Sequence, residues 1–92
     1  MDSQNTYKIA LPENARGRQI RAARTLLGWT KARAAQECRV GVNTIGRYEE
    51  GAGTLTARTV GDIVRTLEAN GIIFVRADVG AGVMLKSTLD DE

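Results

Sequence analysis

Residues 20–51, IRAARTLLGWTKARAAQECRVGVNTIGRYEEG, decide the fold of this chain. The stretch reads as three short helices joined by tight connections, and most of its charged side chains are cationic. A helix, a sharp turn and a second helix with a polar, cationic face form the simplest device for placing side chains in a DNA groove. The stretch therefore predicts such a pair of helices and points to a nucleic acid as the partner.

Apolar residues recur at helical spacing between residues 15 and 70 and predict four helices. The strongest signal is the stripe of Val60, Ile63, Val64 and Leu67, which follows the i, i+3, i+4, i+7 pattern of an amphipathic helix. Residues that favour helix caps set the boundaries. The four helices are expected at 15–27, at 31–38 after Thr30, at 42–50 after Gly41, and from Thr54 or Thr56 to Ala69.

The pattern changes to strand periodicity on both sides of the helical segment. The run TYKIALP alternates like a strand and predicts a short strand over 7–11, which Pro12 ends. After the helices, IIFVR (72–76) and VMLK (83–86) are two β-prone runs around a turn with two glycines, which predicts a β-hairpin. An isolated hairpin is unstable in water, so its partner is either the strand at 7–11 or the same elements of a second copy.

These elements predict a mainly α fold, with four helices, a short N-terminal strand and a C-terminal β-hairpin. We divide the chain into an arm with the strand (1–14), a helical domain (15–70), the hairpin (71–86) and an acidic tail (87–92). A 92-residue chain with only 4% aromatic residues has a thin aliphatic core, and a second copy would bury more apolar surface. We therefore expect the hairpin to mediate dimerisation. The apolar residues expected in that contact are Ile72, Phe74, Val83 and Leu85.

The composition excludes several classes of protein. With one cysteine, Cys38, and no histidine, neither an internal disulfide nor the usual zinc ligands are available, and no cofactor motif is visible. There is no nucleophile motif, and GAG at 51–53 lacks the Lys-Ser/Thr of a phosphate loop, which argues against an enzyme. No apolar run approaches the roughly 20 residues of a membrane span, and no signal peptide is visible. We expect a cytoplasmic protein that binds no membrane.

Charge is distributed unevenly along the chain. Residues 15–60 carry nine Lys and Arg against three Glu, a net charge of +6, whereas the remaining residues carry −4. A basic centre between acidic ends fits a polyanionic partner for the centre. A solvated helical surface rich in arginine would explain the charge alone equally well. The candidates for sequence-independent phosphate contacts are Arg16, Arg18, Arg21, Arg33, Arg39 and Arg58.

One series of residues keeps its spacing without insertion from position 20 to position 51. The series consists of Ile20, Arg24, Leu27 and Gly28, then Thr30 and Lys31, Ala35, Val40, Thr44, Ile45, Arg47, and Tyr48-Glu49-Glu50-Gly51. With this series, residues 18–69 resemble the Cro/CI family of helix-turn-helix transcriptional regulators, also called XRE or lambda-repressor-like. The hairpin resembles that of a small-regulator variant of the family.

The resemblance implies double-stranded DNA as the partner and assigns roles residue by residue. Thr30 and Lys31, at the start of the second helix, would contact phosphate, and Lys31 would also be able to reach a base edge. Arg24 and Glu49 would form a buried ion pair that joins the first helix to the third. The base-reading positions implied for the third helix are Val42, Asn43 and Arg47, and Thr44 matches a position that contacts the DNA backbone.

The chain also departs from the family pattern. Arg39 stands in the turn where glycine is common, so some strain is expected there, and Gly41 replaces the usual hydroxyl cap. Gly46, inside the third helix, costs roughly 1 kcal/mol relative to alanine. We expect its lack of a side chain to let the helix approach DNA closely.

The residues and the resemblance together predict a sequence-specific DNA-binding regulator, with repression favoured over activation. It would bind a palindromic operator through the major groove as a homodimer. Plainer interpretations remain for single residues, because Asn43 and Thr44 could serve only the helix start and Arg47 could be a solvated surface residue. The alternative function is an antitoxin or anti-activator type of module that binds a protein partner through the hairpin edge.

Overall fold

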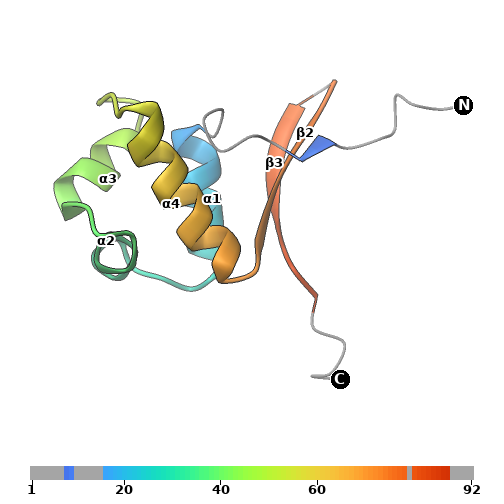
Figure 1. Ribbon diagram of the computed structural model, residues 1–92, viewed down its shortest axis with the longest axis horizontal. Helices are drawn as coiled ribbons and strands as arrows, with labels where there is room; N and C mark the ends of the chain where they lie inside the picture. Colours follow the sequence, from blue (N-terminus) through green and yellow to red (C-terminus); the bar gives the residue numbers. More distant parts are fainter. Residues whose placement is uncertain (1–7, 10–15, 79, 88–92) are drawn as a thin grey trace, which may run out of the picture.

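The computed structural model describes residues 8–9, 16–78 and 80–87 of the chain. Four helices are followed by a two-stranded antiparallel hairpin, and the helices lie on one side of the resulting sheet (Figure 1). A short strand from the N-terminal side pairs with the first strand of the hairpin. The elements are β1 (Lys8–Ile9), α1 (Gly17–Leu26), α2 (Lys31–Cys38), α3 (Val42–Glu49), α4 (Ala57–Ala69), β2 (Ile72–Ala77) and β3 (Gly80–Leu85).

The four helices and the hairpin confirm the prediction, with shifts at their ends. Helix α1 begins at Gly17 rather than at 15, after an N-cap at Arg16. The hairpin connection is shorter than the predicted turn over 77–82, because β2 runs to Ala77 and β3 already starts at Gly80. Four small residues of that predicted turn therefore belong to strands: Ala77, Gly80, Ala81 and Gly82.

The predicted strand at 7–11 falls mostly outside the described residues. Lys8 and Ile9 are described, and they pair antiparallel with Arg76 and Val75 of β2 in the same chain. The sheet has the order β1-β2-β3, so β3 forms one of its edges.

The hydrophobic core is mostly aliphatic, as the low aromatic content predicted, with Phe74 and Trp29 as its aromatic members. The largest fully buried side chains come from α1, α3, α4 and β2, and they are Ile20, Ile45, Ile63, Val64, Leu67 and Phe74. Helix α2 contributes the small residues Ala34 and Ala35, which allow its backbone to approach the other helices closely. Trp29 is buried between α1 and α2, and the Arg33 guanidinium lies 5.1 Å from the centre of its ring.

One buried side chain ties the helical layer to the sheet. The Gln19 side chain on α1 accepts a hydrogen bond from the Arg16 amide at 3.1 Å and donates one to the Gly82 carbonyl oxygen of β3 at 3.1 Å. A buried amide group satisfied at both ends fixes the distance between the two elements it joins. The beginning of α1 is thus anchored directly to β3.

The register of the hairpin decides which residues enter the core. Ile72 and Phe74 of β2 are buried against the helices, and Val83, which pairs with Phe74, packs against the same core. The prediction that Ile72 and Phe74 mediate dimerisation therefore needs correction, because both side chains are enclosed by their own chain. Leu85, which pairs with Ile72, remains exposed.

Candidate nucleic-acid interface

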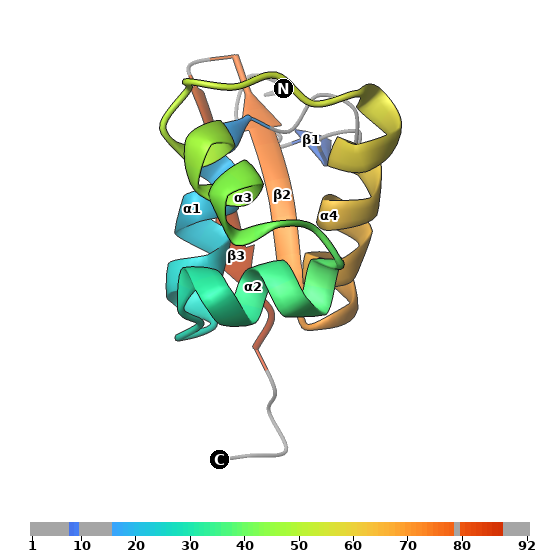
Figure 2. The ribbon, with the colours of Figure 1, turned by 90° about the vertical axis from the view of Figure 1, so that its left-hand side faces the viewer.

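Helix α3 presents two faces of opposite character. Ile45 and Glu49 are buried, whereas Val42, Asn43, Thr44 and Arg47 are exposed. Helices α2 and α3 lie together in front of the sheet when the molecule is viewed from its helical end (Figure 2). The structure thus brings the four predicted DNA-contacting residues of α3 together on the outer side of that helix.

The connection between α2 and α3 is a tight turn. Arg39 adopts the left-handed conformation with φ 60°, which few residues other than glycine adopt without strain. The Val40 amide donates to the Ala35 carbonyl oxygen at 3.0 Å, and the Val40 side chain packs on the core. The strain expected at Arg39 is therefore present, and the turn keeps the sharp angle that the two helices need.

Arg24 and Glu49 lock α3 to α1. The Arg24 Nε and Nη2 atoms donate to the two Glu49 carboxylate oxygens at 2.9 and 3.0 Å, and Nη1 donates to the Trp29 carbonyl oxygen at 3.0 Å. The Glu49 side chain is 0% exposed and that of Arg24 13% exposed. A two-pronged contact of this kind restricts orientation as well as distance, so it fixes how α3 is presented.

Lys31 lies across α3 instead of pointing freely into solvent. Its Nζ atom is 3.6 Å from Glu50 Oε2, and its side chain passes over Gly46. A Cβ atom on Gly46 would meet the Lys31 Cδ and Nζ atoms at 3.7 and 3.8 Å. In the unbound chain the Lys31 side chain thus covers Gly46, so the expected close approach of DNA at this position requires Lys31 to move.

Arg47 is oriented by the loop that follows its own helix. Its Nη2 atom donates to the Ala52 carbonyl oxygen at 3.3 Å, and its side chain packs over Gly53. Among the residues that the structure describes, no acidic side chain pairs with Arg47. Its guanidinium is exposed, held in one direction and free of a compensating charge.

The other predicted contact residues differ in how free they are. The Thr30 hydroxyl accepts a hydrogen bond from the Arg33 amide at 3.0 Å, which caps α2 as predicted and leaves its O–H available. Arg33 pairs with Glu37 at 3.6 Å and covers Trp29, so it is partly engaged within the chain. Arg18 is exposed on α1 and lines a depression of about 430 Å³ with Tyr48 and Glu50.

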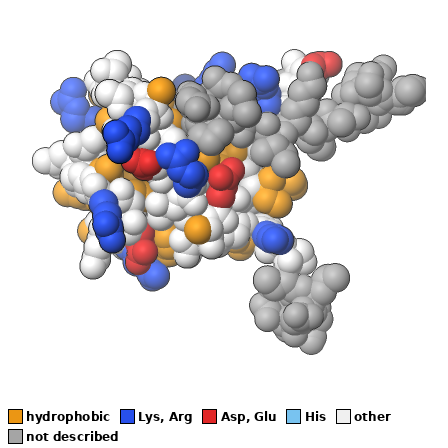
Figure 3. Space-filling model, viewed as in Figure 1, with side chains coloured by type: hydrophobic (Ala, Val, Ile, Leu, Met, Phe, Trp, Pro, Cys, Tyr) orange, Lys and Arg blue, Asp and Glu red, His pale blue; other side chains and the backbone are white. Residues whose placement is uncertain are grey.

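Cationic side chains spread over the helical part of the surface (Figure 3). Several are neutralised by acids of the same chain, including the exposed pair of Arg65 and Asp62 at 2.6 Å on α4. The exposed edge of α3, with Val42, Asn43, Thr44 and Arg47, holds no acidic residue, while Glu50 lies just beyond the end of the helix. Near α3, Arg47 therefore carries a positive charge with no acidic partner among the described residues, whereas Lys31 is paired with Glu50.

Cys38 is buried in the hydrophobic core. Burial raises the pKa of its thiol, a hydrogen bond with the Thr66 side chain lowers it, and the neighbouring Glu37 carboxylate raises it further. The net effect is a raised pKa, so the thiol is less ionised near neutral pH than an ordinary cysteine. Burial likewise raises the pKa of the Tyr48 hydroxyl.

Two short helices crossed at a strained turn, with a polar outer edge on the second, define a helix-turn-helix domain. A family profile described as a helix-turn-helix domain matches residues 17–72, and the chain belongs to this XRE-like family of DNA-binding domains. No curated protein compared with the chain matches it. In the part of the chain that the structure describes, no helix combines the length and apolar character needed to cross a bilayer.

Sequence reasoning missed several residues that shape this interface. No local sequence pattern marks them. The partners of Gln19 and Glu50 are far away in sequence, at Gly82 and Lys31. Ala52 contributes only its backbone oxygen, which accepts from Arg47. A polar residue on the buried stripe of α1 was the one visible signal for Gln19.

Proposed function

We propose that the chain is a sequence-specific transcriptional regulator that inserts α3 into the major groove of DNA. The observation that carries this proposal is the polarity of α3: its inner face is fixed by the Arg24–Glu49 pair, while its outer edge is exposed. A helix held rigidly on one side and polar on the other is what direct readout of base edges requires.

Three of the four exposed residues on the outer edge of α3 can each recognise a feature of a base pair. Asn43 can pair bidentately with adenine, Arg47 can do so with guanine, and Val42 can pack on a thymine methyl group. A good bidentate pair contributes about 1–3 kcal/mol of discrimination. Arg47 is the strongest candidate, because its contact with Ala52 already restricts its direction before DNA binds.

Phosphate contacts would come from the start of α2. The Thr30 hydroxyl and the free amides of the first turn lie at the positive end of the helix dipole, where a phosphate is favoured. Lys31 would exchange Glu50 for a phosphate, which adds a contact that does not depend on sequence. Arg18 and Arg33 are further candidates for such contacts.

A homodimer on a palindromic operator fits a domain of this size. Two copies would read half-sites one helical turn apart, ~34 Å, on the same side of the duplex. Repression is the favoured outcome, since a bound dimer blocks access to the DNA that it covers.

The test is selection of bound DNA from a random pool, followed by affinity measurements on the winning sequence. Arg47→Ala should lose the preference at one base pair, with affinity for the selected site reduced by about 10- to 100-fold. Arg18→Ala should weaken binding to all sequences alike, because a phosphate contact carries no base information. Arg65→Ala, which removes the same charge from a paired residue on α4, should leave both unchanged.

Two results would contradict the proposal. A pool that yields no enriched sequence at low salt would remove DNA recognition altogether. Uniform weakening on every sequence by Arg47→Ala, as for Arg18→Ala, would remove the base-reading role of α3.

A further inference from the structure

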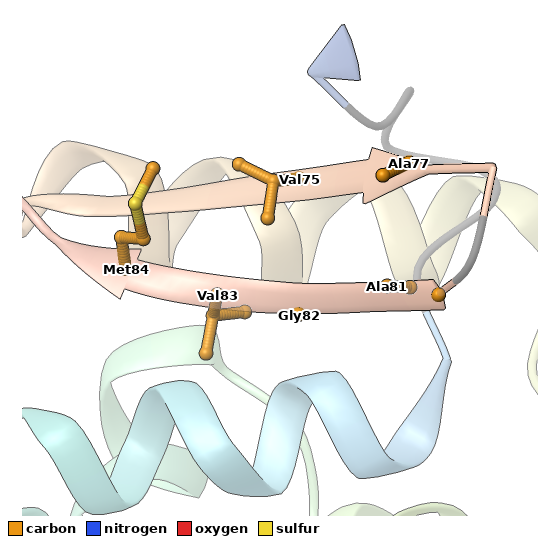
Figure 4. A pocket seen from close by; sticks show the side chains of 7 residues that line it. Val75, Ala77, Ala81, Gly82, Val83 and Met84 are labelled. Carbon is orange, nitrogen blue, oxygen red and sulfur yellow. The ribbon is translucent and has the colours of Figure 1, made fainter. Parts of the chain in front are cut away.

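The side of the hairpin that faces away from the helices is an apolar surface. The register pairs Ile73 with Met84, Val75 with Gly82, and Ala77 with Gly80, and residues paired across two strands lie on the same face of a sheet. We call these six residues the open sheet face. Figure 4 shows Met84 pointing away from α1, whereas Val83, the next residue, points toward it.

The open sheet face has a shape as well as a composition. Met84 is 47% exposed, and it stands beside Gly82 and Gly80, which have no side chains. Together with their neighbours on β2 and β3, these three residues line a hollow of about 340 Å³. Strand β3 thus carries a protruding side chain, Met84, and two residues before it a recessed position, Gly82, on the same face of the sheet.

The chemistry of this surface narrows the choice of partner. None of the six residues is charged, so a nucleic acid or an acidic peptide finds no cation on the face itself. The terminal segments of the chain do not fit it either, because 1–7 is mainly polar and 88–92 is acidic. A contiguous apolar surface on a small domain marks a site of association with another apolar surface.

We propose that the open sheet face is the interface between two copies of this chain. A twofold axis that lies midway between two stacked sheets, parallel to them and perpendicular to β3, and that passes over the point between Met84 and Gly82, places Met84 of each copy over Gly82 of the other. In such an isologous interface the contact between Met84 and Gly82 occurs twice, once on each side of the axis. Sheets packed face to face lie about 10 Å apart, and methionine is long and flexible enough to fill that gap above a glycine.

This inference replaces the predicted contact through Ile72 and Phe74 with the opposite side of the same strands. It supplies the dimer that the proposed function requires, yet it is argued from the sheet alone and does not depend on DNA binding. A second copy would also enclose Val75 and Ile73, which a lone domain leaves partly exposed.

The first test compares two substitutions of equal character on different surfaces. Sedimentation equilibrium of the full chain should give a dimer, and Met84→Lys should raise its dissociation constant at least about tenfold, because it buries a charge in the contact. Leu26→Lys is the matched control, since Leu26 on α1 is 44% exposed against 47% for Met84. Leu26→Lys should leave the dimer unchanged.

The second test exploits the hollow. Gly82→Val should fold normally, because a Cβ atom at Gly82 meets nothing within 4 Å, but it fills the space intended for Met84 of the other copy. It should therefore weaken the dimer. Adding Met84→Ala in the same chain should restore part of the lost affinity, because the double variant exchanges the protruding and the recessed residue. General damage to the fold would not be repaired by removing a second side chain.

A wild-type chain that stays monomeric up to high micromolar concentration would overturn the proposal. So would a dimer that survives Met84→Lys and Gly82→Val, since the contact would then lie elsewhere, for instance at the β3 edge or in another protein. Binding of the variants to a DNA half-site separates the two proposals. A monomer that still prefers its half-site leaves DNA reading intact, and a dimer that ignores DNA leaves the interface intact.

Discussion

Gly17 occupies a position where no side chain fits. A Cβ atom built there would overlap the Tyr48 carbonyl oxygen, because the first turn of α1 touches the backbone of α3. Gly46 lies in a helix too, yet a Cβ atom there would make only ordinary contacts with Lys31. The two glycines therefore have different reasons to be glycine, although both lie inside helices.

Substitution by alanine should change the free energy of unfolding in opposite directions at Gly17 and at Gly46. Gly17→Ala should lower the free energy of unfolding by about 1–3 kcal/mol, because backbone must shift to relieve the overlap. Gly46→Ala should raise it by about 0.5–1 kcal/mol, because alanine favours the helix and the space exists. Equilibrium unfolding in urea measures both. Loss of stability in Gly46→Ala comparable to that in Gly17→Ala would contradict the argument.

At the scale of elements, the Arg24–Glu49 pair connects α1 to α3. The contact is buried on the glutamate side and has two hydrogen bonds between the side chains. By contrast, the Arg65–Asp62 pair lies within the exposed surface of α4, with both side chains more than half exposed. Only the first pair leaves a charge without water if one partner is removed.

The two pairs should differ sharply when broken. Arg24→Met should lower the free energy of unfolding by about 3–5 kcal/mol, because the Glu49 carboxylate is left buried and unpaired. Arg24→Met combined with Glu49→Leu should recover much of that loss. Arg65→Met should change stability by less than about 1 kcal/mol. A loss in Arg24→Met no greater than that in Arg65→Met would show that water reaches Glu49.

The helices could be predicted from the sequence because their signals are local. The stripe on α4 and the threonine caps at Thr30 and Thr56 each specify structure within one or two turns. The hairpin was visible for the same reason, as two β-prone runs around glycines.

The inward face of the hairpin could not be predicted, because β2 is apolar on both sides. In the run of Ile72, Ile73, Phe74 and Val75, alternation gives no preference for one face. A shift of register by one residue exchanges the two faces, and only packing against the helices selects between them. The contact of Lys31 with Glu50 was equally hidden, since it depends on how α2 crosses α3.

At the scale of the whole molecule, internal ion pairs reduce the charge available for DNA. Lys31 is paired with Glu50 and Arg33 with Glu37, both at 3.6 Å and both exposed. Exposed pairs are weak and exchange readily with other partners. The net charge of +2 therefore says less about DNA affinity than the ease with which these pairs open.

Removing the charge on Glu50 should strengthen DNA binding in general. Glu50→Gln releases Lys31 and removes a like charge facing the phosphates, so affinity for all sequences should rise by about 2- to 10-fold. The slope of log affinity against log salt should steepen by up to about one unit. Glu68→Gln, on α4, is the control for the net charge and should give neither change. An unaltered slope in Glu50→Gln would mean that Lys31 reaches no phosphate.

The hydrogen bond from the Gln19 side chain to the Gly82 carbonyl oxygen determines how far the chain could be truncated without loss of the fold. The family match ends at residue 72. Beyond it, Phe74 is buried in the core, and Gly82 of β3 accepts the hydrogen bond from the Gln19 side chain at the start of α1. A fragment trimmed to the matched length would lose a bulky interior ring and the tether of its first helix at once. The hairpin is thus a structural part of the helix-turn-helix domain, and the domain would not fold properly without it.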